Sequence, residues 1–296
     1  MNKTGSNKTG PNKTGSNKTC SNKTWLITGA SSGLGRLMTD RLLGRGDRVI
    51  ATVRRAETLD DLKRQHGDRL VVSVVELTDV AGIEAVVNEA FALTGRIDAI
   101  VSNAGYGLFG AAEEATDEQV AHQIAVNLTG SIKLIRAALP HLRRQGGGRI
   151  MQVSSEGGQI AYPNFSVYHA TKWGIEGFIE SVAQEVKPFG IDFIIIEPGP
   201  TGTNFGASLV RATPMQVYEN TPAGELRRAI AQGNFAIKGD AQRTVDAMIA
   251  AADQAHPALR LTLGSTAYDS ISTALTARLD ALKAQRERAL SADRTM

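Results

Sequence analysis

Short apolar segments alternate with helical patterns along most of the chain. Between neighbouring segments the hydrophobic positions recur three and four residues apart, as in Leu34–Leu43 and Ile83–Leu93, which is typical of amphipathic helices. The first six segments are mostly apolar, as expected of strands buried on both faces of a sheet. This alternation predicts an α/β fold, and right-handed crossovers give a doubly wound parallel sheet in a three-layer αβα sandwich. The predicted strands are Trp25–Thr28, Arg48–Val53, Leu70–Val75, Ala99–Val101, Arg149–Val153, Phe193–Ile196 and Leu259–Leu263.

The first 24 residues follow a different pattern. Asn-Lys-Thr recurs in them with a period of five residues, and no apolar residue lies between Asn2 and Thr19. Such a segment cannot bury a core, so residues 1–24 are predicted to be a disordered tail. Each Asn-Lys-Thr also fits the acceptor pattern for N-glycosylation, but no apolar signal segment lies at the N-terminus, which favours a repeat extension on a cytoplasmic protein. A weak basic arm that contacts anionic surfaces is the alternative interpretation.

The excess positive charge of the chain comes from this tail. Lys and Arg total 33 and Asp and Glu total 30, and five of the lysines lie in residues 1–24, which leaves 28 basic against 30 acidic residues in 25–296. That balance argues against a nucleic-acid partner. No run approaches the ~18 consecutive apolar residues of a membrane span. The only cysteine, Cys20, excludes an internal disulfide, and the scattered histidines show no metal-like spacing, so we expect no metal.

Residues 25–296 are predicted to form one domain, because no linker interrupts them. The stretch from about 200 to 240 is mixed and turn-rich, which favours a substrate-covering segment. Helical spacing with many charges over Thr273–Leu290 indicates a surface or subunit-contact helix.

A glycine-rich turn follows the first predicted strand. It reads Gly29-Ala30-Ser31-Ser32-Gly33-Leu34-Gly35 and runs directly into a helix. Glycines let the backbone turn tightly and approach a pyrophosphate, and the helix N-terminus presents free N–H groups to the anion. The hydroxyls of Ser31 and Ser32 add donors. After the first strand of a βαβ unit, this turn predicts a dinucleotide site, although such turns also occur for packing reasons.

The end of the second predicted strand indicates which dinucleotide binds. Val53 stands where sites selective for NAD carry an acid that accepts hydrogen bonds from the ribose 2′-hydroxyl. Arg54 and Arg55 follow, and a guanidinium pairs well with a 2′-phosphate. We therefore expect NADP(H) in preference to NAD(H), with Arg54 as the contact; a solvated basic loop is the alternative.

Candidate chemistry lies on one predicted helix. Tyr168 and Lys172 are four residues apart and therefore share a helical face. A nearby ammonium stabilises a phenolate, which would lower the tyrosine pKa from ~10 towards the range of a general acid/base. Ser155 ends the predicted strand Arg149–Val153, at the edge where α/β proteins bind ligands. Asn127 lies within an apolar helical pattern, where an amide needs a specific partner.

In order and spacing, these residues resemble the classical short-chain dehydrogenase/reductase family, whose fold is of the Rossmann type. The resemblance extends from Trp25 to about Phe205. It rests on the following residues: Thr28 to Gly35, Asn103-Ala104-Gly105, Asn127, Ser155, Tyr168, Lys172 and Pro198-Gly199.

The resemblance implies a role for each matching residue. Tyr168 would be the general acid/base, Lys172 would lower its pKa and bind the nicotinamide ribose, and Ser155 would orient the carbonyl. Asn127 would hold a water-linked proton relay. The implied cofactor contacts are Gly29, Ser31, Ser32, Gly33, Leu34, Gly35, Arg54, Glu76, Leu77, Asn103, Ala104, Gly105, Tyr168, Lys172, Pro198, Gly199 and Thr203. The resemblance also implies a homodimer or homotetramer.

Together these features predict an oxidoreductase that moves a hydride between NADP(H) and a carbonyl or secondary alcohol of a small, fairly apolar substrate. Apolar residues near the predicted site either line its pocket or only pack the core: Tyr106, Leu108, Phe109, Ile160, Tyr162, Pro163 and Phe165. A non-catalytic NADP(H)-binding regulator of the same fold is the main alternative, and the intact Ser, Tyr and Lys set argues against it. An isomerase or dehydratase of the related extended family is disfavoured by the glycine spacing.

Overall fold

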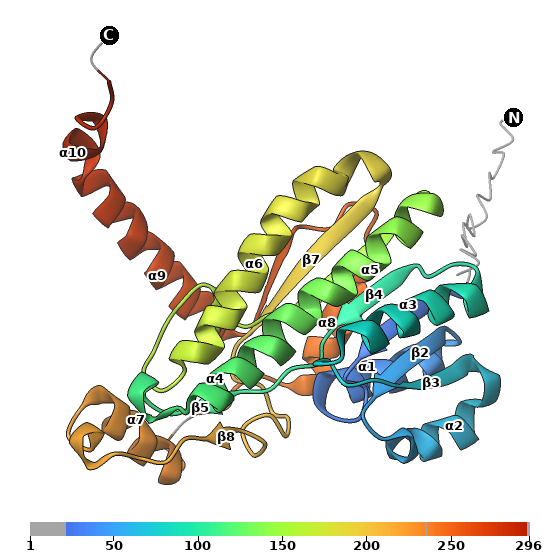
Figure 1. Cartoon of the computed structure of the whole chain (residues 1–296), viewed down its shortest axis with the longest axis horizontal. Coiled ribbons are helices and arrows are strands. Elements are labelled where there is room, and N and C mark those ends of the chain that lie inside the picture. The colour runs from blue at the N-terminus through green and yellow to red at the C-terminus, as the bar shows by residue number, and fades with distance from the viewer. Residues whose placement is uncertain (1–21, 235, 295–296) are drawn as a thin grey trace, which may run out of the picture.

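The computed structural model describes residues 22–234 and 236–294, and its centre is a parallel sheet (Figure 1). The sheet has seven strands in the order β3-β2-β1-β4-β6-β7-β9, and every pairing is parallel. The strands are β1 (Thr24–Thr28), β2 (Arg48–Val53), β3 (Leu70–Val74), β4 (Ala99–Ser102), β6 (Gly148–Val153), β7 (Ile191–Pro198) and β9 (Arg260–Leu263). All seven predicted strands are confirmed.

Helices cover both faces of the sheet, which confirms the doubly wound three-layer sandwich. One core cluster packs α1 (Gly33–Arg45), α2 (Asp60–His66) and α8 (Ala241–Asp253) against the sheet. A second cluster packs α3 (Val80–Thr94), α5 (Ser131–Arg144) and α6 (Ser166–Val186) on the opposite face. The central strands are apolar on both sides because each face meets a helix layer.

The described structure takes in three residues that precede the predicted start of the domain, and two of them make contacts with it. Thr24 opens β1, and the Lys23 ammonium donates to Asp253 Oδ1 at 2.6 Å. Both residues therefore belong to the folded body. The prediction for the rest of the tail, residues 1–21, lies outside the described residues.

The strand order reverses direction next to β1. From β1 the chain steps outwards to β2 and β3, and then returns to the other side of β1 through β4. In open α/β sheets, ligands bind at this switch point, outside the carboxyl ends of the strands. The glycine-rich turn after β1 and the Asn103–Gly105 segment after β4 both lie at that edge.

The predicted covering segment forms a small subdomain at the same end of the sheet (Figure 1). It contains β8 (Val210–Arg211) and α7 (Pro222–Ala231), and β8 pairs in parallel with β5 (Leu108–Phe109). An isolated bridge between Thr201 and Gly239 joins the two ends of the segment. The segment is thus attached to the loop that follows β4.

The remaining helices complete the fold. α4 (Asp117–Ile124) leads into a π-helical turn over Ala125–Gly130, and α9 (Ser265–Ala284) and α10 (Arg286–Leu290) extend away from the sheet (Figure 1). The predicted helix over Thr273–Leu290 therefore exists and is broken at Gln285. Among the helices that the structure describes, none is long and apolar enough to cross a membrane.

Candidate active site

The glycine-rich turn has the shape that a pyrophosphate requires. Gly29 and Gly33 have φ angles of 67° and 56°, in the left-handed region that favours glycine. A Cβ on Gly35 would lie 2.5 Å from the Asn103 amide nitrogen and from the Gly29 carbonyl oxygen. α1 begins at Gly33, and the hydroxyl of Ser32 before it makes no capping hydrogen bond. The helix N-terminus and both serines are therefore available to an anion, and the turn fits the phosphates of a dinucleotide.

Asn103 holds this turn in place. Its amide nitrogen donates to the carbonyl oxygens of Thr28 and Gly29, at 2.9 and 3.2 Å. The Thr28 hydroxyl in turn accepts from the backbone N–H groups of Asn103 and Ala104. These bonds join the end of β1 to the end of β4. The Asn103 side chain therefore fixes the backbone of the glycine-rich turn. The direct contacts of Asn103, Ala104 and Gly105 with a cofactor stay predictions.

The end of β2 presents an exposed arginine at the edge of the site. Val53 is buried, whereas Arg54 is exposed and forms no ion pair among the residues that the structure describes. Arg55 lies 3.8 Å from Glu57. An exposed guanidinium without a carboxylate beside it fits a 2′-phosphate.

The two predicted adenine neighbours differ in burial. Glu76 is exposed, and its carboxylate accepts from the Leu77 backbone N–H at 3.1 Å. Leu77 is buried, and a Cβ on Gly130 would lie 2.7 Å from the Leu77 carbonyl oxygen. The role of both residues at the adenine stays a prediction.

Tyr168, Lys172 and Ser155 come together beside the end of β6. The Lys172 ammonium lies 5.5 Å from the centre of the Tyr168 ring and donates to the Val153 carbonyl oxygen at 2.9 Å. Ser155 is the second residue after β6, and its hydroxyl accepts from the Gly157 N–H at 3.1 Å. All three side chains are buried, so the predicted catalytic group is assembled in a water-poor place.

The pKa of Tyr168 is displaced in the direction opposite to the expected one. Burial raises it to about 12; the hydrogen bond of Ser155 opposes this rise and the charge of Glu156 adds to it. The role of Lys172 in lowering this pKa stays a prediction. Burial also lowers the pKa of Lys172 to about 8, against the opposing charge of Glu176.

Asn127 lies in the π-helical turn between α4 and α5. Its amide oxygen accepts from the Tyr106 N–H at 3.1 Å, and its amide nitrogen donates to the Tyr106 carbonyl at 2.8 Å. The same nitrogen lies 3.5 Å from the Thr171 hydroxyl on α6. The amide thus has a specific partner, the loop after β4, and π-helical turns are frequent at functional sites. The proton-relay role stays a prediction.

The first residues of the predicted covering segment lie close to the tyrosine and the glycine turn. Gly199, after β7, donates its N–H to the Leu263 carbonyl at 3.0 Å, and Pro198 is the last residue of β7. Thr203 lies across from the glycine turn, 3.8 Å from where a Cβ on Gly33 would be. The Phe205 ring lies 5.7 Å from that of Tyr168, a contact that no motif in the sequence indicates.

Aromatic side chains form the wall next to Tyr168. Phe109 and Phe165 pack edge to face at 5.1 Å, and Tyr162 packs edge to face with Phe165 at 5.4 Å. Further apolar residues from the covering segment complete this cluster: Leu209, Leu226 and Ile230. The contribution of α7 was not predictable, because its polar and apolar residues carry no recognisable motif.

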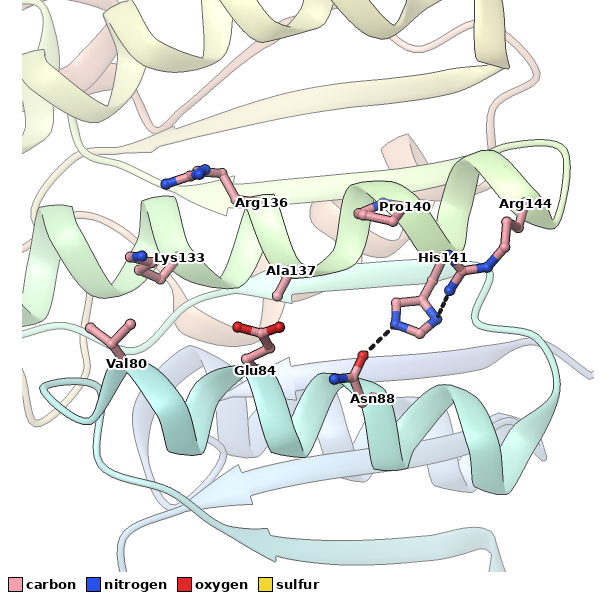
Figure 2. Close-up of a pocket in the computed structure, with 9 residues that line it drawn as sticks. All are labelled: Val80, Glu84, Asn88, Lys133, Arg136, Ala137, Pro140, His141 and Arg144. Atoms are coloured by element: carbon pink, nitrogen blue, oxygen red, sulfur yellow. Dashed lines mark hydrogen bonds between the residues drawn. The ribbon is translucent and has the colours of Figure 1, made fainter.

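A surface groove between α3 and α5 lies apart from this chemistry. Its volume is about 370 Å³, and none of the predicted site residues lines it (Figure 2). His141 Nε2 bonds Asn88 Oδ1 at 2.6 Å, and its Nδ1 accepts from Arg144 at 2.9 Å. Burial and the charge of Arg144 both lower the pKa of His141, so the ring is neutral and already paired. Within residues 22–234 and 236–294, no three metal-ligating side chains gather in one place.

Comparison with known proteins decides the family. A family model described as short chain dehydrogenase matches residues 23–213. The chain belongs to the short-chain dehydrogenase family. An oxidoreductase from Botryotinia fuckeliana (Oxidoreductase BOA17) is 34% identical over 247 residues, which cover 83% of this chain and 90% of that protein.

Two solved structures show the same architecture. A short-chain dehydrogenase from Streptomyces avermitilis is 36% identical, with a TM-score of 0.85, and the match covers 92% of this chain and 99% of that one. A short chain dehydrogenase from Burkholderia cenocepacia in complex with NADP is 26% identical, with a TM-score of 0.70 over 89% of this chain and 97% of that one. The Rossmann-type fold expected of this short-chain dehydrogenase is therefore confirmed.

Proposed function

We propose that this short-chain dehydrogenase transfers a hydride between NADP(H) and the carbonyl or secondary alcohol of a small, apolar substrate. The observation that carries the proposal is the buried group of Ser155, Tyr168 and Lys172 at the carboxyl end of the sheet, next to the glycine turn. Neither a packing role nor cofactor binding alone requires these three polar side chains in one buried place.

Each residue of the group has a task in carbonyl reduction. The Ser155 hydroxyl holds the carbonyl oxygen, and Tyr168, whose raised pKa keeps it protonated at neutral pH, donates a proton to that oxygen. Lys172 binds the nicotinamide ribose and places a positive charge beside the phenol. When bound, the cofactor would supply the hydride and, in its oxidised form, a positive charge near the tyrosine.

The choice of NADP(H) rests on Arg54. Its side chain is exposed and has no carboxylate partner within the described part of the chain, at the end of the strand where an acid would select NAD. A related structure from Burkholderia cenocepacia was solved with NADP, which agrees with this assignment.

The walls of the site favour an apolar substrate. Phe109, Phe165, Phe205 and Leu209 surround the tyrosine, so a substrate carbonyl that reaches Tyr168 lies against aromatic and aliphatic groups. We also infer a homodimer or homotetramer, as the resemblance implies.

The proposal is tested with a panel of ketones, aldehydes and secondary alcohols, followed at the NADPH absorbance band. Tyr168→Phe removes only the phenolic hydroxyl and should lower turnover by about 10² to 10⁴-fold, since general acid catalysis contributes that much. NADPH affinity, measured by quenching of tryptophan fluorescence, should stay within a factor of about three. Unchanged turnover in Tyr168→Phe would overturn the mechanism, and no turnover of any panel member by the unmodified protein would favour the regulator instead.

A further inference from the structure

A cluster of charged side chains lies directly behind Lys172. Glu176 is one helical turn beyond Lys172 on α6, and Glu197 stands on β7 immediately before Pro198. The two residues are only 2% and 1% exposed. Arg260, on the edge strand β9, reaches both carboxylates. A single guanidinium therefore joins the helix of Lys172 to the strand that leads to the predicted nicotinamide loop.

Every oxygen of these two carboxylates has a donor. Glu176 accepts from the Ser154 hydroxyl at 2.5 Å and from Arg260 at 2.6 Å. Glu197 accepts from Thr262 at 2.8 Å and from the Gln159 amide at 3.0 Å, in addition to Arg260. Such complete pairing holds the carboxylates at fixed positions.

The charges in the cluster do not balance without Lys172. Two buried carboxylates face one guanidinium, which also pairs with Glu180 at 2.6 Å. Burying an unpaired charge costs several kcal/mol. Lys172, which is 7% exposed, is a second cation next to the cluster. The Lys172 ammonium compensates the excess negative charge of the two carboxylates. That negative charge in turn stabilises the protonated form of Lys172.

We propose that Glu176, held in place by Arg260 and Ser154, is a positioning residue that keeps Lys172 in its ammonium form. This inference rests on the proposed function, in which the charge of Lys172 serves the proton transfer of Tyr168. It also explains why a polar serine precedes Ser155: the Ser154 hydroxyl fixes the carboxylate, whereas Ser155 faces the substrate side.

The pKa values agree in direction with this assignment. Burial lowers the pKa of Lys172 to about 8, and the charge of Glu176 acts against that fall. Burial raises the pKa of Glu176, and the bonds from Arg260 and Ser154 oppose that rise. The other charged or titratable groups on the elements packed around Lys172 are Tyr168 and His169 on α6, Glu156 after β6, Glu197 on β7 and Arg260 on β9. His169 is neutral, because burial lowers its pKa to about 4.

The decisive variant is Glu176→Gln. A glutamine can keep its oxygen towards Arg260 and turn its amide to the Ser154 hydroxyl, which can accept as well as donate. The substitution then removes the charge and keeps both hydrogen bonds. Glu180→Gln is the matched control, because Glu180 pairs with the same arginine but is 50% exposed at the surface.

The readout is the titration of Lys172 in the full chain without cofactor. Lysines labelled with ¹³C at Cε are followed by NMR, and the signal of Lys172 is the one lost in Lys172→Arg. We expect Glu176→Gln to lower the pKa of Lys172 by about 1 unit, since the loss of a nearby opposite charge shifts a pKa by that order. Glu180→Gln should leave it within about 0.2 unit, because an exposed charge is screened. An unchanged pKa in Glu176→Gln overturns the proposal.

Glu176→Asp keeps the carboxylate but moves it one methylene away. Lys172 should then titrate about 0.5 unit below the unmodified protein. This variant decides the question if the glutamine variant does not fold, and no shift would count against the proposal. Since the titration needs neither cofactor nor substrate, its failure is distinguishable from a failure of the carbonyl panel. In active protein, the alkaline limb of the reduction rate should move down together with the pKa of Lys172.

Discussion

A buried ion pair joins the predicted covering segment, residues 200–240, to the loop that follows β5. One substitution can break this pair. The Glu114 side chain is fully buried, and both its oxygens accept from Arg227 on α7, at 2.7 and 2.8 Å. The backbone N–H groups of Ala111 and Met215 complete its bonding. Arg227→Met keeps most of the side-chain volume and leaves a buried carboxylate without its cation.

One part of the cost of this change, the protonation of Glu114, has an upper limit that depends on pH. Burial alone would raise the pKa of Glu114, but the bonds from Met215, Ala111 and Arg227 hold it below its ordinary value of 4.5. That contribution to stability is present above pH 4.5 and is lost as the pH falls through the pKa of the folded state. Without Arg227, the Glu114 carboxyl can take up a proton, and the protein then no longer buries an unpaired charge. At about 1.36 kcal/mol per pH unit, this costs at most about 3.4 kcal/mol at pH 7 and about 0.7 kcal/mol at pH 5.

Urea unfolding of the unmodified protein and Arg227→Met, at pH 7 and pH 5, measures this difference. We expect a loss of about 2 to 3 kcal/mol in the free energy of unfolding at pH 7, which shrinks below about 1 kcal/mol at pH 5. Arg228→Met is the control, because Arg228 pairs with Glu219 at the surface and should cost under about 1 kcal/mol at both pH values. An equal loss at the two pH values would show that packing, and not the buried charge, is responsible.

Three further predictions concern the site. Arg54→Asp should reverse the preference for NADPH over NADH in kcat/KM, whereas Arg55→Asp should change it by less than about threefold; an unchanged ratio in Arg54→Asp would refute the specificity argument. Gly35→Ala should weaken NADPH binding more than tenfold, because a Cβ there would lie 2.5 Å from the Gly29 carbonyl oxygen. Gly44→Ala in the same helix meets no atom within 4 Å and should stabilise the fold by about 0.5 to 1 kcal/mol. Carbonyl reduction should be constant from pH 6 to 7 and should fall above about pH 8, as Lys172 loses its proton; a constant rate up to pH 9.5 contradicts this.

Much of the architecture could be predicted from the sequence, because short stretches of neighbouring residues determine the strands and helices. Each predicted strand is a run that can be buried on both faces, and Arg48–Val53 has the observed bounds. The site residues at the ends of β1, β4 and β6 follow from the same rule, since the carboxyl ends of parallel strands share one edge. Tyr168 and Lys172 are predictable because four residues separate them on a helix.

The features that escaped prediction depend on contacts between distant segments. Phe205 lies close to Tyr168 although 37 residues separate the two in the chain. Arg260 meets Glu176 across 84 residues, and Arg227 meets Glu114 across 113 residues. The hydrophobic periodicity of a single sequence does not indicate which distant residues form such pairs. The expected fall of the Tyr168 pKa failed for a related reason, because a sequence gives the spacing of charges but not their burial.

Burial shifts the pKa values of Tyr168 and Lys172 in opposite directions. Burial penalises the charged form of each group, so the phenol holds its proton more firmly and the ammonium holds its proton less firmly than in water. In water the two groups titrate near pH 10, whereas here lysine deprotonates several pH units before tyrosine. The protein by itself therefore keeps the phenol neutral, which is the form that carries the proton needed for reduction of a carbonyl. Lys172, however, loses its positive charge at a lower pH than a lysine in water. In our proposal, the buried carboxylate of Glu176 counteracts this loss of the ammonium form.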